Sequence, residues 1–247
     1  MVIRHKFARK RSCSRLRSHA VATTSARALR LLSMLPFLAV PVHAQSVAQV
    51  LGRLDALAPT FRAASANVTW IDYEAVINAE ERQSGTMIVK RYSRTKVHYV
   101  LRFTDPDVYG VALRDNTAER YTPKNNLIQV YDIRRYRDLA QKLMVLGFGM
   151  TGQELAAAFA ISEVYADAVG SQKATHLNLS PKSPDLLKQV NRIEVWISDQ
   201  LGCAVQQKYH FPGGSYKLVT FTDLKLNPKV DDSAMEFPKS AKNEKVN

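Results

Sequence analysis

The sequence predicts an α+β protein built around one large antiparallel sheet. Several runs alternate apolar and polar residues and are separated by turn residues, as in residues 96–103, where Val97, Tyr99 and Leu101 alternate with His98 and Arg102. Helical spacing of apolar residues occurs before these runs and again in the middle of the chain. Successive hairpins with few helices are typical of a single sheet whose helices cover one face.

The first predicted element is a helix that begins near residue 47. Pro59 predicts that this helix stops or kinks there, because proline cannot continue the hydrogen-bond ladder. Its apolar positions recur every three or four residues: Val47, Val50, Leu51, Leu54, Leu57 and Phe61.

Strands follow the helix and then return in the C-terminal half. Asp105-Pro106-Asp107 and Pro212-Gly213-Gly214 are typical turn sequences between them. The expected strands cover residues 68–76, 86–92, 96–103, 108–113, 119–122, 127–131, 175–179, 192–198, 204–211 and 216–226.

Two helices are predicted between the two groups of strands. The first follows Asp132, a good N-cap residue, and ends at the glycines of Gly147-Phe148-Gly149. The second covers residues 151–159. The run Arg134-Arg135-Tyr136-Arg137 is either a solvated helix face or a contact for an acidic lipid or partner.

The N-terminal segment, residues 1–44, has the composition of a signal peptide. The whole chain has a net charge of +13. Residues 1–44 contain nine Lys or Arg residues and no acidic residue, so the rest of the chain carries a net charge of only +4. This distribution argues against nucleic-acid binding. A short apolar run ends at Val42-His43-Ala44, which predicts cleavage after Ala44 and export.

The two cysteines, Cys13 and Cys203, predict neither a lipid anchor nor a disulfide in the exported chain. Cys13 lies within the leader, so it is not placed to accept a lipid after cleavage. Cys203 has no partner motif around it and is expected to be a buried structural residue. The exported protein is therefore expected to be soluble.

The sequence has few of the residue patterns that catalysis requires. His98, His176 and His210 lie far apart, without metal-ligand spacing, and are expected at the surface. Neither a phosphate-binding loop nor a nucleophile elbow is present. We therefore predict no enzyme activity, no metal site and no cofactor.

Several local stretches, taken in order, resemble the periplasmic outer-membrane lipoprotein carrier family (LolA/LolB-like). The resemblance is clearest in the C-terminal half and covers roughly residues 47–239. The matching stretches are Gln83–Met87, Asp105–Asp107, Leu177–Ser183, Ile193–Ile197 with the turn that follows, and Leu226–Pro238.

The resemblance implies a LolA-type soluble carrier domain over residues 45–239. Its sheet would be strongly curved, an incomplete barrel, with helices closing an apolar cavity. Its partners would be acylated lipoproteins, an inner-membrane ABC-type releasing complex and an outer-membrane receptor. The protein would act in the periplasm as a monomer. A carrier for free lipid or glycolipid, or a sensor or regulator that binds a protein partner with this fold, remains an alternative. Residues 240–247 are expected to be a disordered tail.

The family's lid-closing arginine, in an aromatic-Arg-Trp stretch, has no direct counterpart here. The corresponding region is Lys96–Arg102, in which Arg102 or His98 is the candidate substitute. The residues expected to contact the acyl chains come from the sheet and from the mid-chain helix that would act as a lid: Trp70, Met87, Val89, Val97, Tyr99, Leu101, Leu139, Leu143, Met144 and Phe148. From the residues alone, the apolar side chains of this helix are more typical of an ordinary core, and the resemblance favours the lid.

Overall fold

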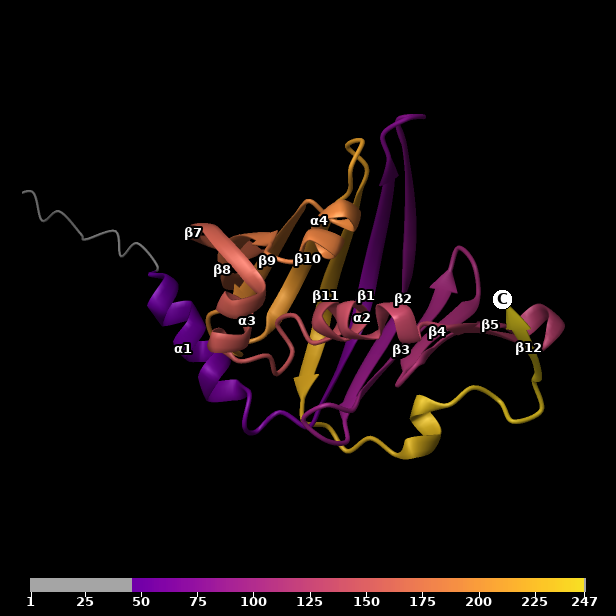
Figure 1. Ribbon diagram of the computed structural model, residues 1–247. Coiled ribbons are helices and arrows are strands. Elements are labelled where there is room, and N and C mark those ends of the chain that lie inside the picture. Colours follow the sequence, from indigo (N-terminus) through magenta and orange to yellow (C-terminus); the bar gives the residue numbers. More distant parts are fainter. Residues whose placement is uncertain (1–45, 247) are drawn as a thin grey trace, which may run out of the picture. The chain divides into compact units, whose positions relative to one another are not determined.

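A computed structural model describes residues 46–246 of the chain. The predicted signal peptide, residues 1–44, lies outside the described residues. Four α-helices are present in the described part: α1 (Val47–Leu57), α2 (Arg137–Met144), α3 (Gly152–Ala158) and α4 (Pro184–Gln189). Figure 1 shows their arrangement around the sheet.

One sheet of twelve strands forms the core of the described chain. The first group of strands is β1 (Ala63–Glu74), β2 (Ala79–Arg91), β3 (Val97–Asp105), β4 (Tyr109–Arg114), β5 (Thr117–Thr122) and β6 (Leu127–Asp132). The second group is β7 (Phe159–Val169), β8 (Gln172–Pro181), β9 (Arg192–Ser198), β10 (Ala204–His210), β11 (Tyr216–Leu226) and β12 (Lys242–Val246).

The strand order is β12-β6-β5-β4-β3-β2-β1-β11-β10-β9-β8-β7, so β1 and β11 join two meanders at the centre. Neighbouring strands are antiparallel except β12 and β6, which are parallel. The sheet stays open, with β12 and β7 at its edges. This open antiparallel sheet with a few helices confirms the predicted α+β incomplete barrel.

Local sequence accounts for the helix ends. Ser46 caps α1 and Thr151 caps α3, each in a capping box with the side chain three residues later. Asp132, expected to cap the lid helix, instead accepts a hydrogen bond from the Arg134 amide at 3.0 Å. A short 3-10 helix (Arg134–Tyr136) therefore precedes α2, which begins five residues after Asp132.

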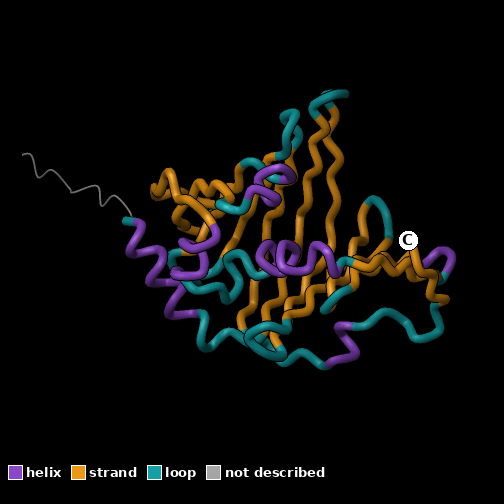
Figure 2. The backbone as a smooth tube through the Cα atoms, viewed as in Figure 1, coloured by secondary structure: helices purple, strands orange, loops and turns teal. Residues whose placement is uncertain are grey.

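The C-terminal segment differs from the disordered tail predicted for residues 240–247. After β11, the chain runs mostly as loop, with one 3-10 helix (Asp232–Met235). It ends in β12, which pairs with β6 (Figure 2). Asn126 fixes this return, because its side-chain amide donates to the Ser240 carbonyl and its carbonyl accepts from the Lys242 amide.

Apolar side chains form two clusters, one on each face of the sheet. The larger lies between the sheet and the helices and includes Leu54, Phe61, Leu155 and Phe159. The smaller lies on the opposite face, where Met235 and Phe237 of the C-terminal segment cover residues such as Val100 and Ala112.

Candidate ligand-binding site

The sheet residues predicted to contact acyl chains all belong to the larger apolar cluster. Strand alternation places their side chains on the face that the helices cover, while the intervening Ile88 and Val100 pack on the opposite face. Burial also raises the pKa of Tyr99. The buried members are Met87, Val89, Val97 and Leu101, and the partly buried ones are Trp70 and Tyr99.

The predicted lid residues pack against the same cluster. Leu139 and Leu143 of α2 are partly buried there, and Phe148, in the loop after α2, is almost completely buried. The side chain of Met144 lies outside the described residues. The structure therefore brings nine of the ten predicted residues onto one continuous apolar surface.

The protein's own side chains fill the space where an apolar cavity was expected. Phe61, Leu146, Phe148 and Phe159 are each at most 1% exposed within the larger cluster. Phe148 packs edge-on against Phe221 of β11, with ring centroids 5.1 Å apart. A ligand could reach this face only if part of the covering layer moved away.

The loop after α2 is anchored to the sheet through its backbone carbonyls. The side-chain amide of Gln207 donates to the Leu146 carbonyl at 2.6 Å. The backbone amide of Ala204 donates to the Gly147 carbonyl at 2.9 Å. Gly147 has φ +73°, and a Cβ there would lie 2.4 Å from the Ala204 Cβ, so glycine is required.

Arg91, at the end of β2, joins the loops that follow α1 and α2. Its guanidinium donates to the Gly149 carbonyl at 2.5 Å and to the Ala58 carbonyl at 3.0 Å, so it joins the loop after α2 to the loop after α1. It also lies over the Phe61 ring, 5.2 Å from its centroid. Sequence reasoning missed this residue, because both carbonyls come from distant loops.

The two candidate substitutes for the family's lid-closing arginine, Arg102 and His98, are on the other face of the sheet. Arg102 donates to the carbonyls of Ala234 and Glu236 in the C-terminal segment, at 2.8 and 2.9 Å. His98 pairs with Asp115 at 3.4 Å. Strand alternation explains this placement, because both residues alternate with Tyr99 and Leu101, which belong to the larger apolar cluster.

A pocket of about 840 Å³ opens beside α2, and none of the predicted ligand contacts lines it. It lies between the end of α1, the β2–β3 turn, α2 and α3. Its charged lining residues are Arg62, Arg91, Arg94, Asp138, Lys142 and Glu154.

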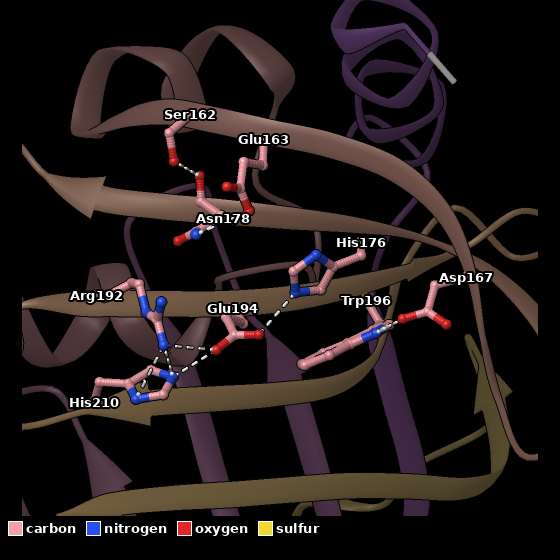
Figure 3. A network of polar contacts seen from close by, with 9 residues as sticks. All are labelled: Ser162, Glu163, Asp167, His176, Asn178, Arg192, Glu194, Trp196 and His210. Atoms are coloured by element: carbon pink, nitrogen blue, oxygen red, sulfur yellow. Dashed lines mark hydrogen bonds and ion pairs between the residues drawn. The ribbon is translucent and has the colours of Figure 1, made fainter. Parts of the chain in front are cut away.

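A polar network occupies the outer face of β8, β9 and β10 (Figure 3). Glu194 accepts from His176 at 2.9 Å and from His210 at 2.6 Å. Burial alone would raise the pKa of Glu194, but these hydrogen bonds together lower it. His176 was expected at the surface; it is 1% exposed because the Tyr165 and Trp196 rings flank it.

This network joins β8, β9 and β10 through their side chains. Among residues 46–246, no group of three or more His, Cys, Asp or Glu side chains is arranged to hold a metal ion. Cys203 is buried as predicted, and burial raises its pKa to about 12, so the thiol stays protonated.

No helix within the described residues is long and apolar enough to span a membrane. No protein-family model and no curated protein matches the sequence.

Solved structures with a similar fold do exist. An uncharacterized conserved protein from Thermus thermophilus has a TM-score of 0.51 at 10% identity, over 82% of this chain and 100% of that one. MucB has a TM-score of 0.50 at 13% identity, over 79% of this chain. The match spans only 64% of MucB. The chain therefore shares its fold, one open and mainly antiparallel sheet with a few helices, with these two structures.

A LolA superfamily protein from Nitrosomonas europaea also matches, with a TM-score of 0.39 at 11% identity, over 78% of this chain and 99% of that one. MucB from Pseudomonas aeruginosa has also been solved in complex with MucA. At these identities, the similarities concern the fold alone.

Proposed function

We propose that this protein is a periplasmic carrier that shields the acyl chains of lipoproteins beneath α2 and transfers them from the inner to the outer membrane. The observation that carries this proposal is the attachment of α2. Its Leu139 and Leu143 cover the apolar sheet face, yet among the described residues Gln141 supplies its one side-chain hydrogen bond to the rest of the protein, to the Thr95 carbonyl at 2.9 Å.

An acyl chain in water would gain more from burial against this face than the leucines of α2 do. Full burial of a leucine side chain contributes about 1.5–3 kcal/mol, and the two leucines of α2 are only partly buried. Each methylene of a buried acyl chain contributes about 0.8 kcal/mol, so one chain of about fourteen carbons outweighs both leucines. Outward movement of α2, with the loop at Gly147 as its pivot, would expose Val89, Tyr99 and their neighbours.

The roles of the partners follow from the family resemblance. An inner-membrane ABC-type complex would release the acylated lipoprotein to this carrier, and an outer-membrane receptor would accept it. The carrier needs no cofactor and performs no chemistry in this scheme. A free lipid or glycolipid is the alternative cargo.

A second candidate is a regulator that binds a protein partner. Two observations favour it: the apolar face is filled by the protein's own side chains, and MucB, which has a similar fold, forms a complex with MucA. In that case the sheet face would stay closed, and the partner would bind elsewhere.

The first test is native purification from a periplasmic extract, followed by mass spectrometry of the bound material. Acylated lipoproteins at near one-to-one stoichiometry are expected. Free phospholipid or glycolipid would keep the carrier function and change the cargo. A protein without bound lipid that also fails to release lipoproteins from inner-membrane vesicles would contradict the proposal and favour the regulator.

A charge on α2 tests the site itself. Leu143→Glu should abolish cargo binding and leave the protein folded, because a carboxylate on this face opposes an apolar ligand. Leu187→Glu is the matched control, since Leu187 lies on α4 and is 45% exposed. Normal cargo binding by folded Leu143→Glu protein would exclude α2 as the lid.

A further inference from the structure

The pocket beside α2 carries an excess of positive charge. Four cationic side chains line it, from the loop before β1, the end of β2, the β2–β3 turn and α2, against two carboxylates. Its volume, about 840 Å³, lies within the roughly 300–1,000 Å³ of small-molecule sites.

One of the two carboxylates is already engaged. Glu154 accepts a hydrogen bond from the Thr151 amide at 2.9 Å and pairs with Arg94 at 3.2 Å. The backbone hydrogen bond from Thr151, followed by its pairing with Arg94, lowers the pKa of Glu154. Its charge is therefore shared between the helix cap, Arg94 and Arg91, and Asp138 is the second carboxylate of the lining.

Arg91 is a fixed, half-buried cation at this site. Hydrogen bonds to Gly149 and Ala58 hold its guanidinium in place, and its Nε is buried without a hydrogen-bond partner. Burial lowers the pKa of Arg91; the charge of Glu154 raises it, and the charges of Arg62 and Arg94 lower it again. A bound anion would offset the repulsion between these guanidiniums, and arginine is well suited to phosphate and carboxylate groups.

The pocket and the apolar face lie on two sides of the same helix. Asp138, Gln141 and Lys142 of α2 line the pocket, while Leu139 and Leu143 face the apolar cluster. A ligand with acyl chains under α2 would therefore have its polar end beside this pocket.

We propose that the pocket binds a phosphate-bearing headgroup, which favours the alternative cargo of the carrier, a free anionic lipid whose acyl chains lie beneath α2, over a lipoprotein. The acyl-chain half of this inference rests on the proposed carrier function, whereas the headgroup half rests on the pocket alone. The same chemistry would also attract free phosphate, so the test separates the two sources.

The test compares three probes by isothermal titration calorimetry with the full-length protein stripped of bound lipid. Lauroyl lysophosphatidate and monolauroylglycerol share one acyl chain and differ in the phosphate, and inorganic phosphate lacks the chain. We expect lysophosphatidate to bind at least about tenfold more tightly than either of the other two, since one charge-assisted hydrogen bond contributes about a factor of ten. This preference should weaken at high salt.

A charge-neutralised variant locates the effect. Arg94→Gln combined with Lys142→Gln removes two exposed cations of the pocket and should reduce the preference about tenfold or more, with monolauroylglycerol binding unchanged. Lys225→Gln combined with Lys229→Gln is the matched control, because these exposed lysines do not line the pocket.

The outcomes separate the two proposals. Equal binding of both lipids would overturn the headgroup site and leave the carrier function standing. Inorganic phosphate binding as tightly as lysophosphatidate would overturn the lipid assignment in favour of a free-phosphate site. If no probe binds, the headgroup site and the free-lipid cargo are both overturned, and the native purification separately tests the lipoprotein carrier. If the control variant loses the preference for lysophosphatidate to the same extent, the effect comes from the overall charge of the protein, and the proposed headgroup site is overturned.

Discussion

Helix α2 and the loop that follows it cover the same sheet face but are held in different ways. The loop combines the buried Phe148 ring with three carbonyls that accept hydrogen bonds from β2 and β10. The helix has two partly buried leucines and a single side-chain hydrogen bond within the described residues. The loop is therefore part of the core, whereas the helix is held by fewer contacts, as the proposed replacement of α2 by a ligand requires.

The strongest test of this difference removes an apolar side chain from each region. Phe148→Ala should lower the free energy of unfolding by about 3–5 kcal/mol, because it leaves a cavity in a closely packed cluster. Leu139→Ala should cost less than about 2 kcal/mol, since that side chain is only partly buried. Urea unfolding measures both, and equal losses would show that α2 is as firmly packed as the loop.

A second test breaks the connection made by Arg91. Arg91→Gln should lower the free energy of unfolding by about 2 kcal/mol, because it removes charged hydrogen bonds to Gly149 and Ala58. Arg91→Lys should recover part of the loss by reaching one of the two carbonyls. Full stability of Arg91→Gln protein would show that the carbonyls find other donors and that Arg91 does not hold the lid region.

The smallest effect is expected from the single hydrogen bond of α2. Gln141→Ala should cost about 0.5 kcal/mol or less in global stability. Hydrogen exchange should show the α2 amides exchanging roughly twofold faster, while the Ala204 amide, bonded to Gly147, keeps its rate. Faster exchange at both places would mean that helix and loop open as one unit.

Much of the sheet and of the apolar face followed from local patterns. Alternation placed Val97, Tyr99 and Leu101 on one face, and the β2–β3 register places Met87 and Val89 on the same face. The face that the helices cover became clear only in the folded chain, because it depends on how the mid-chain insertion returns over the sheet.

Features that depend on distant partners could not be predicted in this way. Lys242–Val246 has the composition of a solvated tail, and it becomes a strand only because β6 offers a free parallel edge. Arg91 carries no motif, and its importance comes from two loop carbonyls 33 and 58 residues away. His176 resembles a surface histidine until Tyr165 and Trp196 enclose it.

The pairing of β1 with β11 at the centre of the sheet has a consequence for how the chain folds. Tyr73 lies opposite Tyr216, so the central pair joins segments that lie far apart in the sequence. Closing such a long loop costs conformational entropy before any contact is gained, which makes folding slow, on the order of milliseconds to seconds. The nascent chain therefore cannot complete its core until residues 216–226 have been synthesised, and it should remain open to chaperones until late in synthesis.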